Sequence, residues 1–187
     1  TNCSISLGPV DSIYLGGGTP SLIDEKEISS ILDFIERHFS KSPDAEVTIE
    51  VYPGTLKAKK LESYLDAGIN RISVGVESFQ DRLLKQVDRT HSSQETLATI
   101  DLCRQQGFTN INLDLIAGLS SQSEEDWEKN LEQVVSLSPE HLSLYLLEAD
   151  DNTRLGRQSL GQLGSQGCFE FPDEELVARF YEQSVDY

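Results

Sequence analysis

From near the start of the chain to about residue 150, short apolar runs typical of strands alternate with segments in which apolar residues recur at helical spacing. The short apolar or β-branched runs that predict strands are residues 12–15, 47–51, 71–76, 111–116 and 141–147. Between these runs apolar residues recur at helical spacing, as at Ile28, Leu32 and Ile35. Five strands that alternate with helices are typical of a parallel sheet with crossover helices.

Local signals predict where several of the helices begin and end. Asp24 with Glu27, and Ser92 with Glu95, have the spacing of a capping box at a helix N-terminus. Gly68 follows a run of helical spacing and predicts its C-terminal cap.

The pattern changes after residue 150. Residues 151–171 contain glycines separated by serine and glutamine, which predicts a flexible excursion, and residues 172–187 return to helical spacing. The strand pattern starts close to the first residue and the helical pattern runs to the last. We therefore expect a fragment, truncated at both ends, of one longer barrel-like domain, with its core of βα units in residues 11–150.

Composition narrows the class of protein. Hydrophobic residues make up 37% of the chain and charged residues 25%, as in folded globular proteins. No stretch approaches the ~20 consecutive apolar residues of a membrane span, and the first residues show no secretory signal pattern. Lys and Arg number 15 against 32 Asp and Glu, a net charge of −17. This charge argues against nucleic acid or an anionic membrane surface as a partner.

The cysteines and histidines form no recognisable set of metal ligands. Cys3, Cys103 and Cys168 are far apart, and no CxxC or CxxxC pair occurs. Their odd number and wide spacing do not suggest a disulfide framework, so we expect a reducing compartment, the cytoplasm. No metal ligand is predicted in this chain.

Polar residues collect where the predicted strands end. The first strand is followed by Gly16-Gly17-Gly18-Thr19-Pro20, and the other four end close to Glu50, Glu77, Asp114 and Glu148. In parallel α/β sheets and barrels, ligands bind at the carboxyl ends of the strands. A carboxylate on a buried strand is costly unless it is paired or contacts a ligand. The combination predicts a small-molecule site.

Each feature taken alone also has a structural interpretation. The glycine run matches neither GxGxxG nor a P-loop and could be a tight turn that needs positive φ. A single acid could pair with an arginine such as Arg71 or Arg89. As a ligand site, the acids would bind hydroxyls or an ammonium group and Arg89 a carboxylate. S-adenosylmethionine carries all three groups.

Five motifs occur in an order and at intervals that resemble a known family. They are Tyr14–Ser21 (YLGGGTPS), Thr48–Glu50 (TIE), Gly75–Phe79 (GVESF), Asn112–Leu119 (NLDLIAGL) and Pro139–Tyr145 (PEHLSLY). Together they resemble the radical S-adenosylmethionine (SAM) proteins of the oxygen-independent coproporphyrinogen III oxidase group, over residues 11–153. Residues 143–153 are more similar to the HemW-like haem-chaperone branch than to the oxidase.

The resemblance implies an α/β fold, a partial and open (βα) barrel of parallel strands with outer helices. It also implies a set of S-adenosylmethionine contacts. The glycine loop with Gly17, Gly18 and Thr19 holds the methionine amino group, with Glu50 as its acidic contact. The remaining implied contacts are Arg89 to the methionine carboxylate, Glu77 and Asp114 to the ribose hydroxyls, and Glu148 at the end of the next strand. Position 77 is usually Gln in the family, and an ionised Glu cannot donate a hydrogen bond.

The resemblance further implies a [4Fe–4S] cluster held by a CxxxCxxC loop, which this sequence lacks. We therefore expect the chain as given to be inactive in radical chemistry, with the cluster ligands elsewhere in a full-length protein. The implied partners are haem or a porphyrin and a haem-acceptor protein. The alternatives are a coproporphyrinogen III oxidase, which oxidatively decarboxylates two propionates, and a cluster-free module that binds a nucleoside.

Overall fold

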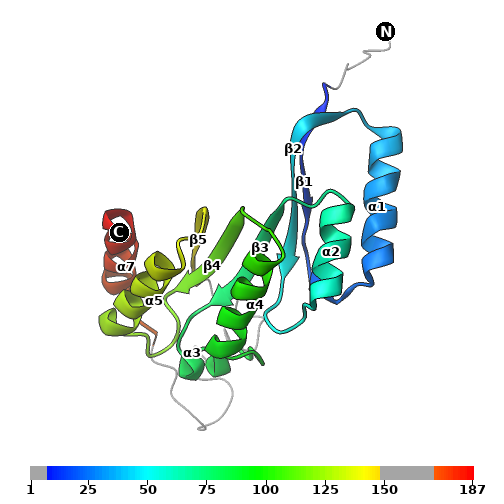
Figure 1. Cartoon of the computed structure of the whole chain (residues 1–187). Helices are drawn as coiled ribbons and strands as arrows, with labels where there is room; N and C mark the ends of the chain where they lie inside the picture. The colour runs from blue at the N-terminus through cyan, green and yellow to red at the C-terminus, as the bar shows by residue number, and fades with distance from the viewer. Residues whose placement is uncertain (1–7, 148–170) are drawn as a thin grey trace, which may run out of the picture.

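The computed structural model of the chain describes residues 8–147 and 171–187, and within them five parallel strands form one sheet (Figure 1). The strands are β1 (Val10–Leu15), β2 (Lys41–Val51), β3 (Arg71–Glu77), β4 (Ile111–Ala117) and β5 (His141–Leu146). Their order in the sheet is their order in the sequence, and each pairs in parallel with the next. Every crossover therefore advances the sheet in the same direction.

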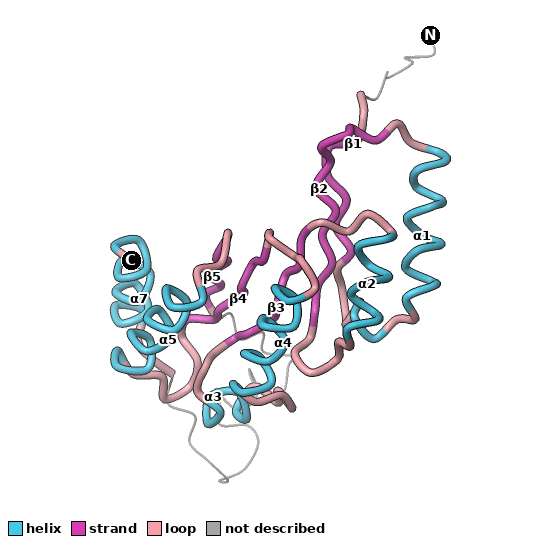
Figure 2. Tube along the Cα trace, in the orientation of Figure 1, coloured by secondary structure: helices cyan, strands magenta, loops and turns pink. Residues whose placement is uncertain are grey.

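Helices connect the strands on the outer side of the sheet (Figure 2). They are the 3₁₀ helix η1 (Pro20–Leu22), α1 (Glu25–His38), α2 (Ala58–Asp66), α3 (Asp81–Gln86), α4 (Ser93–Gln105) and α5 (Glu124–Leu137), with α7 (Glu174–Asp186) near the C-terminus. Right-handed crossovers that all advance in one direction place their helices on one face, and the sheet curls away from them. The predicted open half-barrel with outer helices is confirmed. Within the described part of the chain, no helix has the length and apolarity to cross a membrane.

The two faces of the sheet differ because neighbouring strand residues point to opposite sides. Ile49 and Leu113 are fully buried in the core between sheet and helices, where each contributes roughly 1.5–3 kcal/mol by leaving water. The alternate residues Glu50, Ser73 and Asp114 line a cavity on the opposite, concave face. Alternation alone thus makes one face a core and the other a polar surface.

Helix caps agree in part with the predicted signals. Ser92 and Glu95 form a complete capping box at the start of α4. Asp24 caps α1 through the Lys26 N–H, but the reciprocal bond expected from Glu27 is not formed, so the predicted box is wrong there. A second complete box, at Ser123 of α5, was not predicted.

The predicted final helix is observed as α7, which packs against α5. The indole Nε1 of Trp127 donates to the carbonyl of Phe180 at 2.7 Å, and the two rings stack with centroids 5.6 Å apart. Apart from Phe171, the glycine-rich excursion predicted over 151–171 lies outside the described residues.

A buried amide holds the loop between β3 and α3. Asn130 of α5 is inaccessible to solvent, and its Oδ1 accepts the backbone N–H of Phe79 at 2.8 Å. The Ser78 hydroxyl also donates to this oxygen, at 3.4 Å. Because this loop directly follows Glu77, the amide helps to place a predicted site residue.

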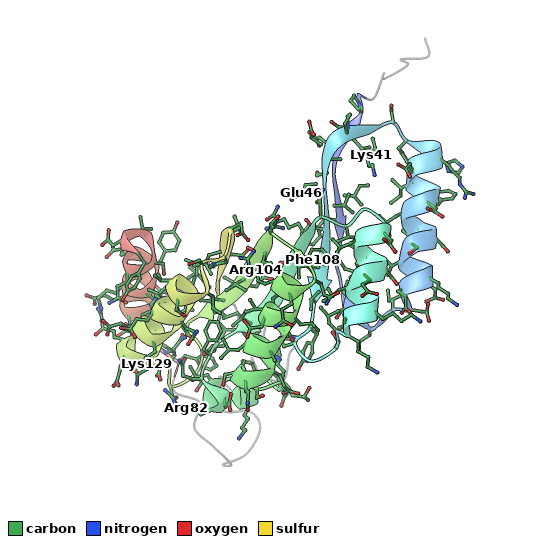
Figure 3. All side chains as sticks on the ribbon, viewed as in Figure 1. Lys41, Glu46, Arg82, Arg104, Phe108 and Lys129 are labelled. Atoms are coloured by element: carbon green, nitrogen blue, oxygen red, sulfur yellow. The ribbon has the colours of Figure 1, made fainter. Side chains whose placement is uncertain are left out.

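We expect Asn130→Ala to lower the free energy of unfolding by about 1–3 kcal/mol, because the Phe79 N–H loses its partner. Urea denaturation measures the change. Lys129→Ala is the matched control on the same helix, where Lys129 pairs with Glu125 at the surface (Figure 3). It should cost less than about 0.5 kcal/mol. Equal losses in the two variants would contradict the role given to the amide.

Candidate active site

A cavity of about 390 Å³ lies on the concave face, at the carboxyl ends of the strands. The predicted residues that line it are Gly18, Thr19, Glu50, Glu77, Arg89 and Asp114. Gly17 is joined to the site through Glu50, and Glu148 lies outside the described residues. The parallel pairing thus brings together predicted residues that are up to 96 positions apart in the sequence, from Gly18 to Asp114.

The glycine loop after β1 is fastened to the end of β2. Glu50 accepts the Gly17 N–H through Oε2 at 3.0 Å and the Tyr14 hydroxyl through Oε1 at 3.1 Å. Gly17 and Gly18 have φ of 89° and 61°, which glycine adopts without strain. A Cβ on Gly16 would lie only 2.9 Å from Glu50 Oε1. The loop is therefore a tight turn that needs glycine and also a wall of the cavity.

Asp114 lies within β4 and not at its end, because the strand continues to Ala117. Its Oδ2 accepts the Ser73 hydroxyl at 2.9 Å, and its Oδ1 accepts the side-chain amide of Asn112 at 2.8 Å. A carboxylate has about four acceptor positions, so these two bonds leave capacity for a ligand. Among the described residues no arginine pairs with Asp114, so the alternative of an acid paired with Arg71 or Arg89 does not hold for this carboxylate.

Glu77 ends β3 and forms an ion pair with Arg89 across the cavity wall. Glu77 is only 7% exposed, and burial raises the pKa of its carboxyl although the Arg89 guanidinium acts in the opposite direction. The charge of Asp114 raises this pKa further. The alternative interpretation, in which an acid pairs with an arginine, is thus correct for Glu77 and Arg89. Arg71 pairs instead with Glu46, which does not line the cavity, at 3.8 Å.

The described lining of the cavity carries three carboxylates and one guanidinium. With Glu77 paired to Arg89, the charges of Glu50 and Asp114 remain uncompensated by any cation in that lining. A cavity walled by carboxylates attracts a positively charged ligand. Its hydrogen-bonding groups are suited to hydroxyls, an ammonium group and, at Arg89, a carboxylate.

Sequence reasoning missed several lining residues. They are Tyr52, Ser73, Gly75, Ile116 and Tyr145, among others. The first four lie two or four positions from a predicted carboxylate along the same strand or its extension, so the two-residue period could have identified them. Tyr145 is brought in by its pairing with Ile116 on the neighbouring strand, for which the sequence has no signal.

The described residues do not fit an iron–sulfur cluster. No group of three or more His, Cys, Asp or Glu among them is placed to hold a metal ion. Cys103 is fully buried in the core, and burial raises the pKa of its thiol to about 12, so it supplies no thiolate at neutral pH.

The ionisation of Glu77 has a consequence for stability. Burial raises the pKa of the Glu77 carboxyl in the folded protein above the ordinary value of 4.5. The contribution of this carboxyl to the free energy of unfolding is therefore fully present below pH 4.5, and it is lost as the pH rises through the raised pKa. We therefore expect the unliganded Glu77→Gln variant to gain stability relative to wild type between pH 4 and pH 8, measured by urea unfolding. A difference that is constant, or that falls with pH, would contradict the raised pKa.

Comparison with known proteins identifies the family of the chain. The model of the radical SAM superfamily matches residues 3–134. The heme chaperone HemW of Escherichia coli (strain K12) is 41% identical over 147 residues, which cover 79% of this chain and 39% of that protein. The heme chaperone HemW of Haemophilus influenzae is 38% identical over 180 residues, or 96% of this chain and 45% of that protein. The chain thus spans less than half the length of these curated relatives.

A solved structure has a similar fold. Coproporphyrinogen III oxidase (HemN) from E. coli, described as a radical SAM enzyme, superposes with a TM-score of 0.79 at 26% identity. The match covers 95% of this chain and 39% of the oxidase. The resemblance predicted from the five motifs is therefore confirmed: the chain belongs to the radical SAM superfamily.

Proposed function

We propose that the cavity binds S-adenosylmethionine, as part of a HemW-like radical SAM protein that handles haem. The observation that carries this proposal is the assembly of six predicted contact residues around one cavity of a parallel half-barrel. S-adenosylmethionine and a [4Fe–4S] cluster are the cofactors that the superfamily implies. The net negative lining suits S-adenosylmethionine, which carries a sulfonium and an ammonium group.

The methionine end of the ligand is assigned to the glycine loop and Arg89. The backbone of Gly17 and Gly18, the Thr19 hydroxyl and the Glu50 carboxylate surround the proposed position of the amino group. Arg89 binds the methionine carboxylate, and it does so in competition with its ion pair to Glu77. This competition makes the Glu at position 77 a determinant of affinity.

The nucleoside end is assigned to the strands β3 to β5. Asp114 and Glu77 accept hydrogen bonds from the ribose hydroxyls, and Asp114 is held for this role by Ser73 and Asn112. Ile116 and Tyr145 are neighbours in the register and offer an apolar surface for the adenine. Glu148 keeps its predicted role as a further contact, outside the described residues.

Reductive cleavage of S-adenosylmethionine in the full-length protein would need an electron from a [4Fe–4S] cluster, which the described residues of this chain do not fit. The sequence contains no CxxxCxxC loop, so the proposal assigns no cluster ligand to this chain. The residues of this chain bind and orient the cofactor. The cytoplasmic location, expected from the scattered cysteines, is part of the same proposal.

Asp114→Asn tests the cofactor site. In the full-length, cluster-loaded protein we expect the dissociation constant for S-adenosylmethionine to rise about 5- to 150-fold, or 1–3 kcal/mol, because charge-assisted bonds to the ribose are lost. Isothermal titration calorimetry measures it. The stability of the unliganded protein should change little, because Ser73 and Asn112 can still bond the amide.

The matched control is Glu46→Gln on the same face of the sheet. Glu46 lies four residues before Glu50, outside the cavity lining, and is labelled in Figure 3. This control should leave the affinity for S-adenosylmethionine unchanged. A large loss of stability in Asp114→Asn with unchanged affinity would show a structural carboxylate and defeat the assignment.

The haem-handling role rests on the relatives. Two proteins named heme chaperone HemW are 41% and 38% identical to this chain, against 26% for the oxidase structure. We therefore propose haem as the ligand of the whole protein and a haem-acceptor protein as its partner. The oxidase remains the second candidate, because its fold matches with a TM-score of 0.79.

Two assays on the full-length protein separate these functions. We expect a saturable change in haem absorbance on titration, followed by transfer of haem to a haem-free acceptor. Anaerobic incubation with coproporphyrinogen III, S-adenosylmethionine and a reductant should release no carbon dioxide. Release of carbon dioxide would favour the oxidase, and S-adenosylmethionine binding with neither activity would favour the cluster-free nucleoside-binding module.

A further inference from the structure

A tyrosine outside the predicted site joins β2 to the loop that carries Arg89. Tyr52 directly follows β2 and lines the cavity. Its phenol oxygen accepts the backbone N–H of Thr90 at 2.8 Å and that of His91 at 3.2 Å. It also lies 2.9 Å from the hydroxyl of Thr90. One side-chain oxygen therefore bonds two consecutive N–H groups of a loop 38 residues further along the chain.

The aromatic ring of Tyr52 contacts the same loop. The Arg89 guanidinium carbon lies 5.8 Å from the ring centroid, within the range of a cation–π contact. The ring of His91 meets it edge-on, with centroids 4.9 Å apart. Burial raises the pKa of Tyr52, but the hydrogen bonds from Thr90 and His91 and the charge of Arg89 outweigh it, so the pKa is lowered.

The outer side of the loop is held by different contacts. The Arg89 N–H donates to the carbonyl of Leu84 in α3 at 3.0 Å, and the Ser93 N–H donates to Asp81 at 2.8 Å. These bonds tie the loop to α3.

On the side of the sheet, the Arg89 guanidinium pairs with Glu77 at the end of β3, and His91 Nε2 lies 3.4 Å from the carbonyl oxygen of Val76 in the same strand. Tyr52 adds the connection to β2, and it holds the loop through two backbone N–H groups next to Arg89.

We propose that Tyr52 is a positioning residue that sets where the Arg89 guanidinium stands and thereby tunes recognition of the ligand's carboxylate. Arginine has a long, flexible side chain, and its reach into the cavity depends on where the loop backbone is held. The inference rests on the proposed binding of S-adenosylmethionine and deepens it. Tyr52 acts through Arg89 and the loop.

Tyr52→Phe tests this role, because it removes the hydroxyl and keeps the ring beneath Arg89. Two ligands are titrated into the full-length, cluster-loaded protein by calorimetry. They are S-adenosylmethionine and 5′-methylthioadenosine, which retains the nucleoside but lacks the amino acid moiety. We expect the dissociation constant to rise at least about fivefold for the first and less than about twofold for the second.

Two further variants control the result. Tyr64→Phe makes the same substitution at a buried tyrosine of α2 whose hydroxyl has no hydrogen-bond partner among the described residues, and it should change neither affinity. In an Arg89→Gln background, Tyr52→Phe should cause no further loss for S-adenosylmethionine, because the group it positions is gone.

The outcomes separate the inference from the proposed function. Equal weakening of both ligands by Tyr52→Phe, or no weakening of either, overturns the positioning role alone. A wild-type protein that binds neither ligand overturns the proposed cofactor site.

Amide hydrogen exchange on the wild-type protein needs no variant. The N–H groups of Thr90 and His91 should exchange more slowly than the exposed N–H groups of the same surface, because each donates to Tyr52. Fast exchange at both positions also contradicts the inference.

Discussion

The parallel pairing of five strands in sequence order is the constraint on which the rest of the structure depends. Because each crossover advances in the same direction, the helices gather on one side and the other side of the sheet becomes a concave surface. Strand alternation then sends Val74 and Leu113 into the core and Ser73 and Asp114 to the concave face. The cavity is a direct result of this division.

Placing several acids in that cavity has an electrostatic cost, and the structure offsets it at each carboxylate in a different way. Glu50 accepts hydrogen bonds from a backbone N–H and a phenol, Asp114 from a hydroxyl and an amide, and Glu77 is paired with Arg89. Neutral donors stabilise a carboxylate without cancelling its charge. Glu50 and Asp114 therefore stay available to a cationic ligand, whereas Glu77 is partly committed to its arginine.

The Glu77–Arg89 pair connects the two ends of the proposed ligand. Glu77 is assigned to the ribose and Arg89 to the methionine carboxylate, so a change at one alters the other. Tyr52 adds a third member, because it bonds the loop on which Arg89 is carried. Specificity in this site thus resides in a small coupled group, and single residues within it are not independent.

The sequence by itself determined the order of strands and helices, the cap at Ser92 and the presence of carboxylates near the strand ends. These features depend on periodicity and short-range spacing, which can be recognised directly in the amino-acid sequence. Only the tertiary structure decided that Glu77 pairs with Arg89 while Arg71 pairs with Glu46, and that Tyr52 reaches the Arg89 loop. Those contacts join residues 12 to 38 positions apart, and they depend on how far each crossover carries the chain across the sheet. No local pattern encodes that distance, so the ligand-binding residues could be proposed from the sequence while their partners could not.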